Sequence, residues 1–234
     1  MKIKFYSIPV LLTTIIFFSC VSNADNFFIP VPEPWYFERS VTIGVDINSI
    51  IETKDGASAE FLPEWLLAFL EGGIDAVEML HLFNNKYVFI GVNKNVNFIV
   101  VNRWADFYSP VQDFPMLAAV RIENRMILTS SLYPDDEYGF FFERLVKNAY
   151  NAVYPGVVKN DTSWIKINTE NDIDESINRN PSEIYMSFVL FSIDKPLMQD
   201  IIRNLITQTL ETVTPSANQA VAVNRLRQNF FEGF

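Results

Sequence analysis

The stretch EIYMSFVLFSIDKP, residues 183–196, decides the fold of this chain. Its first part, residues 183–193, is strongly apolar, which is typical of a buried β-strand. The next three residues, DKP, cap a helix whose apolar positions are Leu197, Ile201, Leu205 and Leu210. A buried strand that leads directly into an amphipathic helix predicts a sheet with helices packed against it.

Similar patterns place the other elements along the chain. Strands are expected at residues 35–51, 87–92, 98–101 and 157–167, with turns at residues 54–57 and 93–97. Helices are expected at residues 62–83, with a break at Gly72-Gly73, and at residues 113–128, 135–154 and 216–230. Strands and helices interleave, as in α+β and α/β proteins. We expect an α+β fold, with one mixed or antiparallel sheet covered by helices and with a C-terminal helix.

Two of these helices carry clear core positions. Residues 113–128 are apolar on more than one face, so this helix is expected inside the fold. In residues 135–154 one row at helical spacing is formed by Phe141, Leu145, Ala149 and Ala152. Pro155-Gly156 then ends the helix.

The N-terminus has the three parts of an export signal. Lys2 and Lys4 supply a positive start, and residues 5–18 form an uncharged, mostly apolar run. The run is too short to span a bilayer comfortably, since a spanning helix needs about 20 residues, so it predicts a signal peptide. It ends at Ser19 and Cys20, the only cysteine in the chain.

The Ser19-Cys20 pair resembles the processing site of bacterial lipoproteins, in which the cysteine is acylated and becomes the new N-terminus. The bulky Phe17 and Phe18 before it resemble the relaxed sites of spirochaetal lipoproteins. The alternative is an uncleaved signal anchor with a buried cysteine. We expect three segments: a lipoprotein signal peptide at residues 1–19, a tether at residues 20–34 and a single α+β domain at residues 35–234.

Cleavage before Cys20 changes the balance of charge. It leaves 215 of the 234 residues. Because it removes two lysines and no acid, the net charge falls from −10 to −12. No later segment has an uncharged apolar run long enough to span a membrane.

Composition excludes several functions. The chain has 28 acidic and 18 basic side chains, and a net charge of −10 does not suit a nucleic-acid binder, which must neutralise phosphates. One cysteine cannot form an internal disulfide, and one cysteine with one histidine cannot build a zinc site of the usual kind. We therefore expect no metal, no cofactor and no nucleic acid.

No standard catalytic motif occurs in the sequence, because G-x-S-x-G, H-E-x-x-H, G-x-x-x-x-G-K and G-x-G-x-x-G are all absent. His81, the only histidine, has no nucleophile motif beside it, and we interpret it as a surface or partly buried residue. The acidic residues 135–137 suit a helix N-terminus without any further role. A carboxylate pair for glycoside hydrolysis remains an alternative, because the separation of such a pair is spatial.

The candidate contact residues are acidic and aromatic. Residues 168–182 are polar, acid-rich and aperiodic, so we expect a long exposed loop. Within it Asp172, Asp174 and Glu175 partly match a calcium loop, but the required glycine and distal glutamate are missing, so a solvated loop is preferred. Three consecutive phenylalanines, residues 140–142, cannot share one helix face. Phe140 is therefore a candidate for contact with another element, a lipid surface or a partner.

Several motifs together resemble a known family. They are Pro63-Glu64-Trp65, the strand at residues 87–92, the Ala118-Ala119-Val120-Arg121-Ile122 helix, Trp164 in a later strand, and the step from strand to helix at residues 189–195. Over residues 61–213 the chain resembles the small outer-membrane lipoproteins of the Helicobacter type and spirochaetal envelope lipoproteins. That family is similar to the N-terminal domain of the flagellar assembly protein T. The resemblance implies a non-catalytic envelope lipoprotein and carries over no active-site residue.

We therefore expect a lipid-anchored cell-envelope lipoprotein, acylated with palmitate-type chains at Cys20. The absence of Asp directly after Cys20 favours the outer membrane, facing the periplasm, by resemblance to enterobacterial sorting. Its expected role is structural, or the binding of an envelope protein or peptidoglycan. The alternatives are a carboxylate-based envelope hydrolase, which needs two carboxylates in a cleft, and a carrier of a small apolar ligand, which needs an apolar cavity.

Overall fold

The computed structural model describes residues 45–130, 139–168 and 183–213, and the single positions 220, 223, 224, 227, 228, 230 and 231. The chain divides into two units, Met1–Pro34 and Trp35–Phe234, and every described residue belongs to the second. Cys20 and the 169–182 segment lie outside the described residues.

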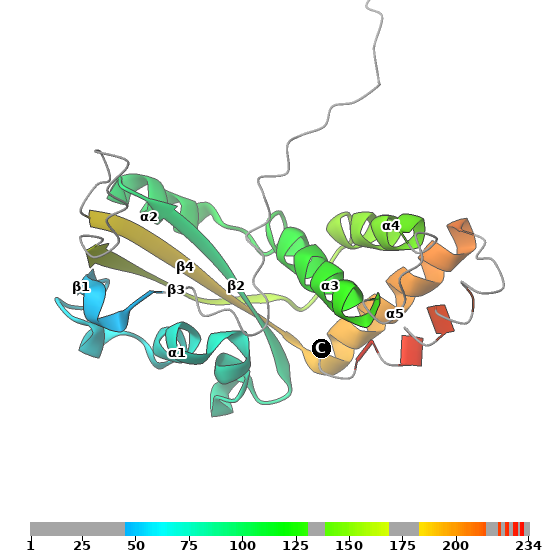
Figure 1. Cartoon of the computed structure of the whole chain (residues 1–234), viewed down its shortest axis with the longest axis horizontal. Helices are drawn as coiled ribbons and strands as arrows, with labels where there is room; N and C mark the ends of the chain where they lie inside the picture. Colours follow the sequence, from blue (N-terminus) through cyan, green and yellow to red (C-terminus); the bar gives the residue numbers. More distant parts are fainter. Residues whose placement is uncertain are drawn as a thin grey trace, which may run out of the picture. The chain divides into compact units, whose positions relative to one another are not determined.

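The described part of the chain is built on one antiparallel sheet of four strands (Figure 1). The strands are β1 (Ile50–Thr53), β2 (Lys86–Asn95), β3 (Val158–Asn168) and β4 (Glu183–Asp194). Their order across the sheet is β1-β3-β4-β2, and every pairing is antiparallel. The expected α+β class, with an antiparallel sheet and a helix after the last strand, is confirmed.

β4 lies inside the sheet and is covered on both of its faces. Every residue from Met186 to Ile193 is buried, because β3 and β2 flank the strand and helices pack above and below it. Side chains alternate along the strand, so Phe188 enters one core and Val189 enters the other. The sheet therefore separates two hydrophobic cores.

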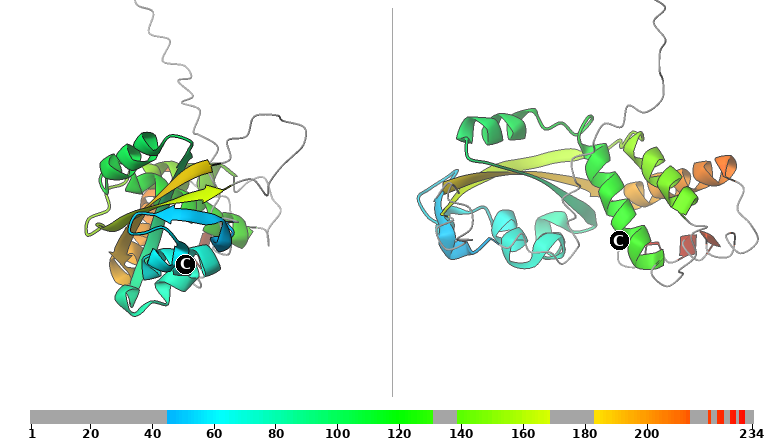
Figure 2. Two further views of the ribbon diagram at one scale, coloured as in Figure 1. Left: turned by 90° about the vertical axis from the view of Figure 1, so that its left-hand side faces the viewer. Right: turned by 45° about the horizontal axis from the view of Figure 1, so that its top comes forward.

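α1 (Glu64–Glu78) covers one face of the sheet, as Figure 2 shows from two further sides. Pro63 is the N-cap of this helix, which begins at Glu64 and not at residue 62 as predicted. The ring of Phe69 packs edge-on against that of Phe188, with 6.2 Å between the ring centres. Gly73 has a φ of 70° inside the helix, so the predicted break at Gly72-Gly73 is confirmed as a kink.

On the other face the structure describes α2 (Phe98–Phe107), α3 (Phe114–Ser130), α4 (Gly139–Tyr150) and α5 (Lys195–Thr212). Figure 1 shows α2 on the opposite side of the sheet from α1, with α3, α4 and α5 grouped beside the end of β4. Their shared core includes Phe114 of α3 and Phe191 of β4, both fully buried. No helix among the described residues is long and apolar enough to cross a membrane.

α2 replaces the strand predicted at residues 98–101, so that prediction is wrong. The sequence FIVV favours a strand locally, but the Asn97 side chain accepts a hydrogen bond from the Ile99 backbone N–H (2.9 Å) and starts a helix. The helix then returns over β2, where the Tyr108 ring lies against Gly91. A Cβ atom on Gly91 would lie 3.0 Å from that ring, so a larger residue there would have to displace the Tyr108 ring slightly.

Removal of the Asn97 cap is expected to weaken the fold. Asn97→Ala should lower the free energy of unfolding by about 1 kcal/mol, because the Ile99 N–H loses its acceptor at the helix N-terminus. Asn97→Asp is the matched control, since it keeps an acceptor in the same place. Urea unfolding measures both variants, and equal stabilities would contradict the role of the cap.

Other boundaries differ from the expected ones for reasons of packing. β2 continues to Asn95, because its pairing with β4 extends as far as Tyr185. Residues 47–49 form a 3-10 helix, η1 (Ile47–Ser49), instead of part of a strand, because the Asp46 side chain accepts a hydrogen bond from the Asn48 N–H.

The buried faces of the later helices were predicted with mixed success. In α4 the row of Phe141, Leu145 and Ala149 is buried, as expected. In α5 the predicted positions Leu197, Ile201 and Leu210 are only half-buried at the rim of the core. The buried positions are Met198, Ile202, Leu205, Ile206 and Thr209. The α5 face is thus shifted by about one residue, because the contact with α4 and β4 decides which side turns inward.

A bulge in β3 sends two polar side chains to opposite faces of the sheet. The pairing of β3 with β4 shifts register between Lys159 and Asp161. Asp161 accepts a hydrogen bond from Trp65 Nε1 of α1 (2.9 Å). Lys159 Nζ donates to the carbonyl oxygens of Ala105 (2.7 Å) and Tyr108 (3.0 Å) at the end of α2, and partial burial there lowers the pKa of Lys159. One strand thereby holds helices on both faces.

Candidate functional site

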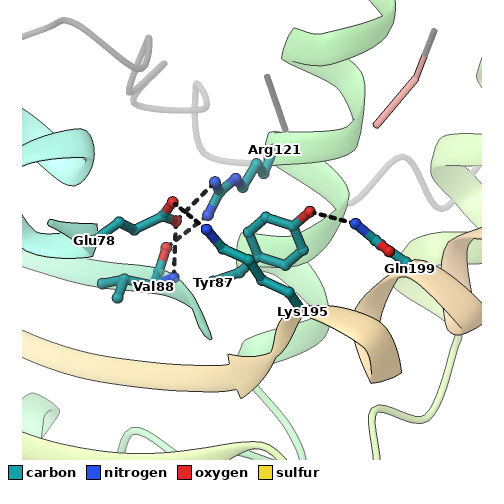
Figure 3. A network of polar contacts seen from close by, with 6 residues as sticks. All are labelled: Glu78, Tyr87, Val88, Arg121, Lys195 and Gln199. Carbon is teal, nitrogen blue, oxygen red and sulfur yellow. Dashed lines mark hydrogen bonds and ion pairs between the residues drawn. The ribbon is translucent and has the colours of Figure 1, made fainter. Parts of the chain in front are cut away.

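A polar network surrounds the edge strand β2 and joins helices from both faces of the sheet (Figure 3). Glu78 Oε1, at the end of α1, accepts hydrogen bonds from the backbone N–H of Val88 (3.0 Å) and from Arg121 Nη2 (2.9 Å). Arg121 Nη1, on α3, donates to the carbonyl oxygen of Val88 (2.8 Å). An ion pair therefore binds both of the backbone groups that Val88 directs away from β4.

The ion pair is largely removed from solvent. The side chains of Arg121 and Glu78 are 13% and 7% exposed. The Arg121 guanidinium lies 5.1 Å from the centre of the Tyr87 ring and 5.0 Å from that of Phe89, so two aromatic faces stabilise the charge. A buried charge of this kind depends on its partners, because desolvation alone would make it costly.

The network continues into α5. Lys195 Nζ lies 4.0 Å from Glu78 Oε2 and 5.3 Å from the centre of the Tyr87 ring. Gln199 Nε2 donates to the Tyr87 hydroxyl (3.1 Å). The contacts thus connect α1, β2, α3 and α5, so the network holds these four elements together.

Among the described residues, no group of three or more His, Cys, Asp or Glu side chains is placed to hold a metal ion.

A second candidate lies at the surface, where β2 passes into α2. Three apolar side chains are exposed there: Val96 (57%), Ile99 (61%) and Val100 (45%). We call these three residues the β2–α2 corner. A single exposed apolar residue is common on any protein, but three so close in the chain form a patch that is available for contact.

Three half-buried aromatic rings gather next to this corner. The centre of the Phe98 ring lies 4.8 Å from that of Trp164 and 5.3 Å from that of Tyr185. Trp164 and Tyr185 are on the α2 side of the sheet, since their neighbours Ile165 and Met186 enter the α1 core. The three rings belong to neither of the two main cores, so they form a separate aromatic cluster near the surface.

Basic side chains flank the corner, and one of them is paired with an acid. Lys166 Nζ binds Glu183 (2.6 Å) and lies 5.6 Å from the centre of the Tyr185 ring. The hydrogen bond with Glu183 raises the pKa of Lys166. From residue 79 to residue 105 the sequence has no acidic residue, and its basic residues are Lys86, Lys94 and Arg103. In a chain of net charge −10 this stretch is locally basic.

Only some of the candidate residues predicted from the sequence lie among the described residues. Phe140 is the second residue of α4. His81 begins the 3-10 helix η3 (His81–Phe83) and is exposed, so its interpretation as a surface residue is confirmed. The predicted lipidation site and the predicted acidic contact residues lie outside the described residues: Cys20, Asp172, Asp174 and Glu175.

Glu78, Arg121 and the β2–α2 corner are not identified as sites from the sequence. A signal for Arg121 was present, because it stands between Val120 and Ile122 in a helix expected inside the fold, and a charge in that position requires a partner. The partner, Glu78, comes from another helix on the other face of the sheet, so sequence spacing does not reveal it.

The corner is hidden from sequence reasoning for a different reason. The sequence predicts a turn at Val96 and a strand at Ile99 and Val100, and the exposure of the last two follows from their position in the first turn of α2. Comparison of the chain with models of protein families, with curated proteins and with solved structures found no match.

Proposed function

We propose that this chain is a lipid-anchored lipoprotein of the cell envelope that binds an envelope protein or peptidoglycan without catalysing a reaction. The observation that carries the proposal is Cys20, the only cysteine, at the end of an uncharged apolar run that follows Lys2 and Lys4. Acyl chains contribute roughly 0.8 kcal/mol for each buried methylene, so two or more palmitate-type chains at Cys20 suffice for stable anchoring. We place the protein in the outer membrane, facing the periplasm.

The fold supports a binding role. Glu78 and Arg121, a largely buried pair of charged side chains, bind each other and the edge of β2, and so they serve the fold. What the described residues offer a partner is therefore surface. Phe140 and the acidic residues Asp172, Asp174 and Glu175 remain the predicted contact residues for an envelope partner.

Cys20→Ala is expected to abolish incorporation of labelled palmitate and to release the protein from membranes, because it removes the thiol group that lipid attachment requires. Metabolic labelling and phase partition in detergent measure the two effects. Ser19→Ala is the matched control, since it keeps a small residue before Cys20 and should leave both readouts unchanged. Continued labelling of the Cys20→Ala protein would overturn the anchor.

The partner is best identified in the intact envelope. Crosslinking of the anchored protein, followed by identification of the crosslinked species, should yield a protein or a peptidoglycan fragment. The triple variant Asp172→Asn, Asp174→Asn, Glu175→Gln should lose that product if the acidic segment makes the contact. An unchanged product would remove these residues from the contact surface.

A further inference from the structure

We propose that the β2–α2 corner touches the surface of the phospholipid bilayer to which the chain is tethered. The inference rests on the proposed lipid anchor, which would hold the protein at the bilayer, but the residues that make the contact are different ones. Val96, Ile99 and Val100 enter the boundary between head groups and acyl chains, while the sheet and its two cores remain outside.

The chemistry of the corner fits a bilayer surface. Its exposed side chains are aliphatic, and Trp164 and Tyr185 pack against Phe98, the residue directly before Ile99. Tryptophan and tyrosine rings are favoured at the level of the head groups, because one end of each ring is apolar and the other is polar. Lys94 and Arg103 are exposed on either side in sequence, and such long side chains reach lipid phosphates while their stems stay on apolar surface.

The corner also lies at the end of the sheet where the described chain begins. One row across the sheet is formed by the pairs Ile50 with Ile167, Ile167 with Ile184, and Asn95 with Tyr185. Val96 follows Asn95 directly, so the corner adjoins this row. The opposite end, where residue 86 pairs with residue 194, is about 30 Å further along β2.

The length of chain between Cys20 and the described residues is compatible with this contact. Residues 21–44 separate Cys20 from the first described residue, Val45. A chain of that length reaches at most about 85 Å, so it permits the corner to meet the bilayer.

The contact is expected to depend on apolar side chains and not on anionic lipid. Glu52 and Glu183 belong to the same end of the sheet. These negative charges oppose attraction to anionic head groups. Vesicles of phosphatidylcholine alone should therefore bind the protein, with no gain from added phosphatidylglycerol.

The test uses the chain from residue 20 onward with Cys20→Ser, so that no acyl chain contributes, and measures its sedimentation with phosphatidylcholine vesicles. Adding Ile99→Asp should lower the partition coefficient roughly tenfold or more, because a carboxylate enters the apolar boundary. Ile99 is exposed in the first turn of α2, where an acidic side chain is favoured, so the fold should be retained. An unchanged melting temperature checks this.

Val153→Asp is the matched control. Val153 is 82% exposed and lies just before β3, whose first residues pair with the far end of β4, so the control replaces another exposed aliphatic residue by the same acid at the opposite end of the sheet. Its partition should equal that of the unsubstituted protein. Equal partition of the Ile99→Asp and Val153→Asp proteins, or no vesicle binding by the unsubstituted protein, overturns the inference.

The vesicle test and the labelling test of the proposed anchor give independent results. Acylation is measured by labelling at Cys20, whereas the vesicle test contains no acyl chain, so either result can fail without the other. If Ile99→Asp leaves vesicle binding intact but removes a crosslinked envelope protein, the corner is a protein-binding surface and the bilayer inference is overturned.

Discussion

Phe114→Ala is expected to lower the free energy of unfolding by about 3–5 kcal/mol. Phe114 begins α3 and is fully buried. Its ring centre lies 4.7 Å from that of Phe89, 5.2 Å from that of Tyr154 and 5.9 Å from that of Phe191. Loss of the ring removes contacts to two strands at once and leaves a cavity that the surrounding rings cannot fill without moving.

Urea unfolding at equilibrium measures this loss. Phe107→Ala is the matched control, because it makes the same chemical change at the surface. Phe107 is 80% exposed at the end of α2. The control should stay within about 0.5 kcal/mol of the wild-type protein. A loss below about 1 kcal/mol for Phe114→Ala would show that the α3 core does not depend on this ring.

Glu78→Ala is expected to cost about 3 kcal/mol, close to what breaking a buried ion pair costs in other proteins. It removes the acceptor of the Val88 N–H and takes the carboxylate away from Arg121, which is 13% exposed. For a domain of this size the melting temperature should fall by about 6–12 °C. Thermal unfolding followed by circular dichroism gives the value.

The exposed pair of Arg203 and Asp200 supplies the control. Their side chains are 56% and 67% exposed at an N–O distance of 2.7 Å, so Asp200→Ala should change stability by less than about 1 kcal/mol. A double variant, Glu78→Ala with Arg121→Met, should recover part of the loss, because it leaves no buried charge behind. If Glu78→Ala and Asp200→Ala cost the same, the buried network contributes no more than a surface ion pair.

Much of the fold can be predicted from the sequence because its strands and helices are strongly patterned. The apolar run of β4, the strand β3, the kink at Gly73 and the helix α3 all follow from local composition and spacing. α2 does not, since FIVV has strand-like composition and only the Asn97 cap and the packing of Tyr108 on Gly91 make it a helix. Tertiary contacts outweigh local preference there.

The candidate sites were harder to predict for a physical reason. The pairing of Glu78 with Arg121 brings together two helices on opposite faces of the sheet, and it depends on where the edge of β2 lies. The exposure of Ile99 depends on which side of α2 turns inward. Both are properties of packing. The predicted lipidation of Cys20, in contrast, rests on a local sequence pattern, so that prediction needs no knowledge of packing.

The binding of Val88 by Glu78 and Arg121 also affects how copies of this protein meet. A strand at the edge of a sheet is a template on which another strand can add, and repeated addition gives open-ended polymers. At Val88 the N–H and the C=O are already bound by side chains, so a second strand cannot pair continuously along β2. The Glu78–Arg121 ion pair therefore interrupts the edge of β2 at Val88 as a template for strand addition.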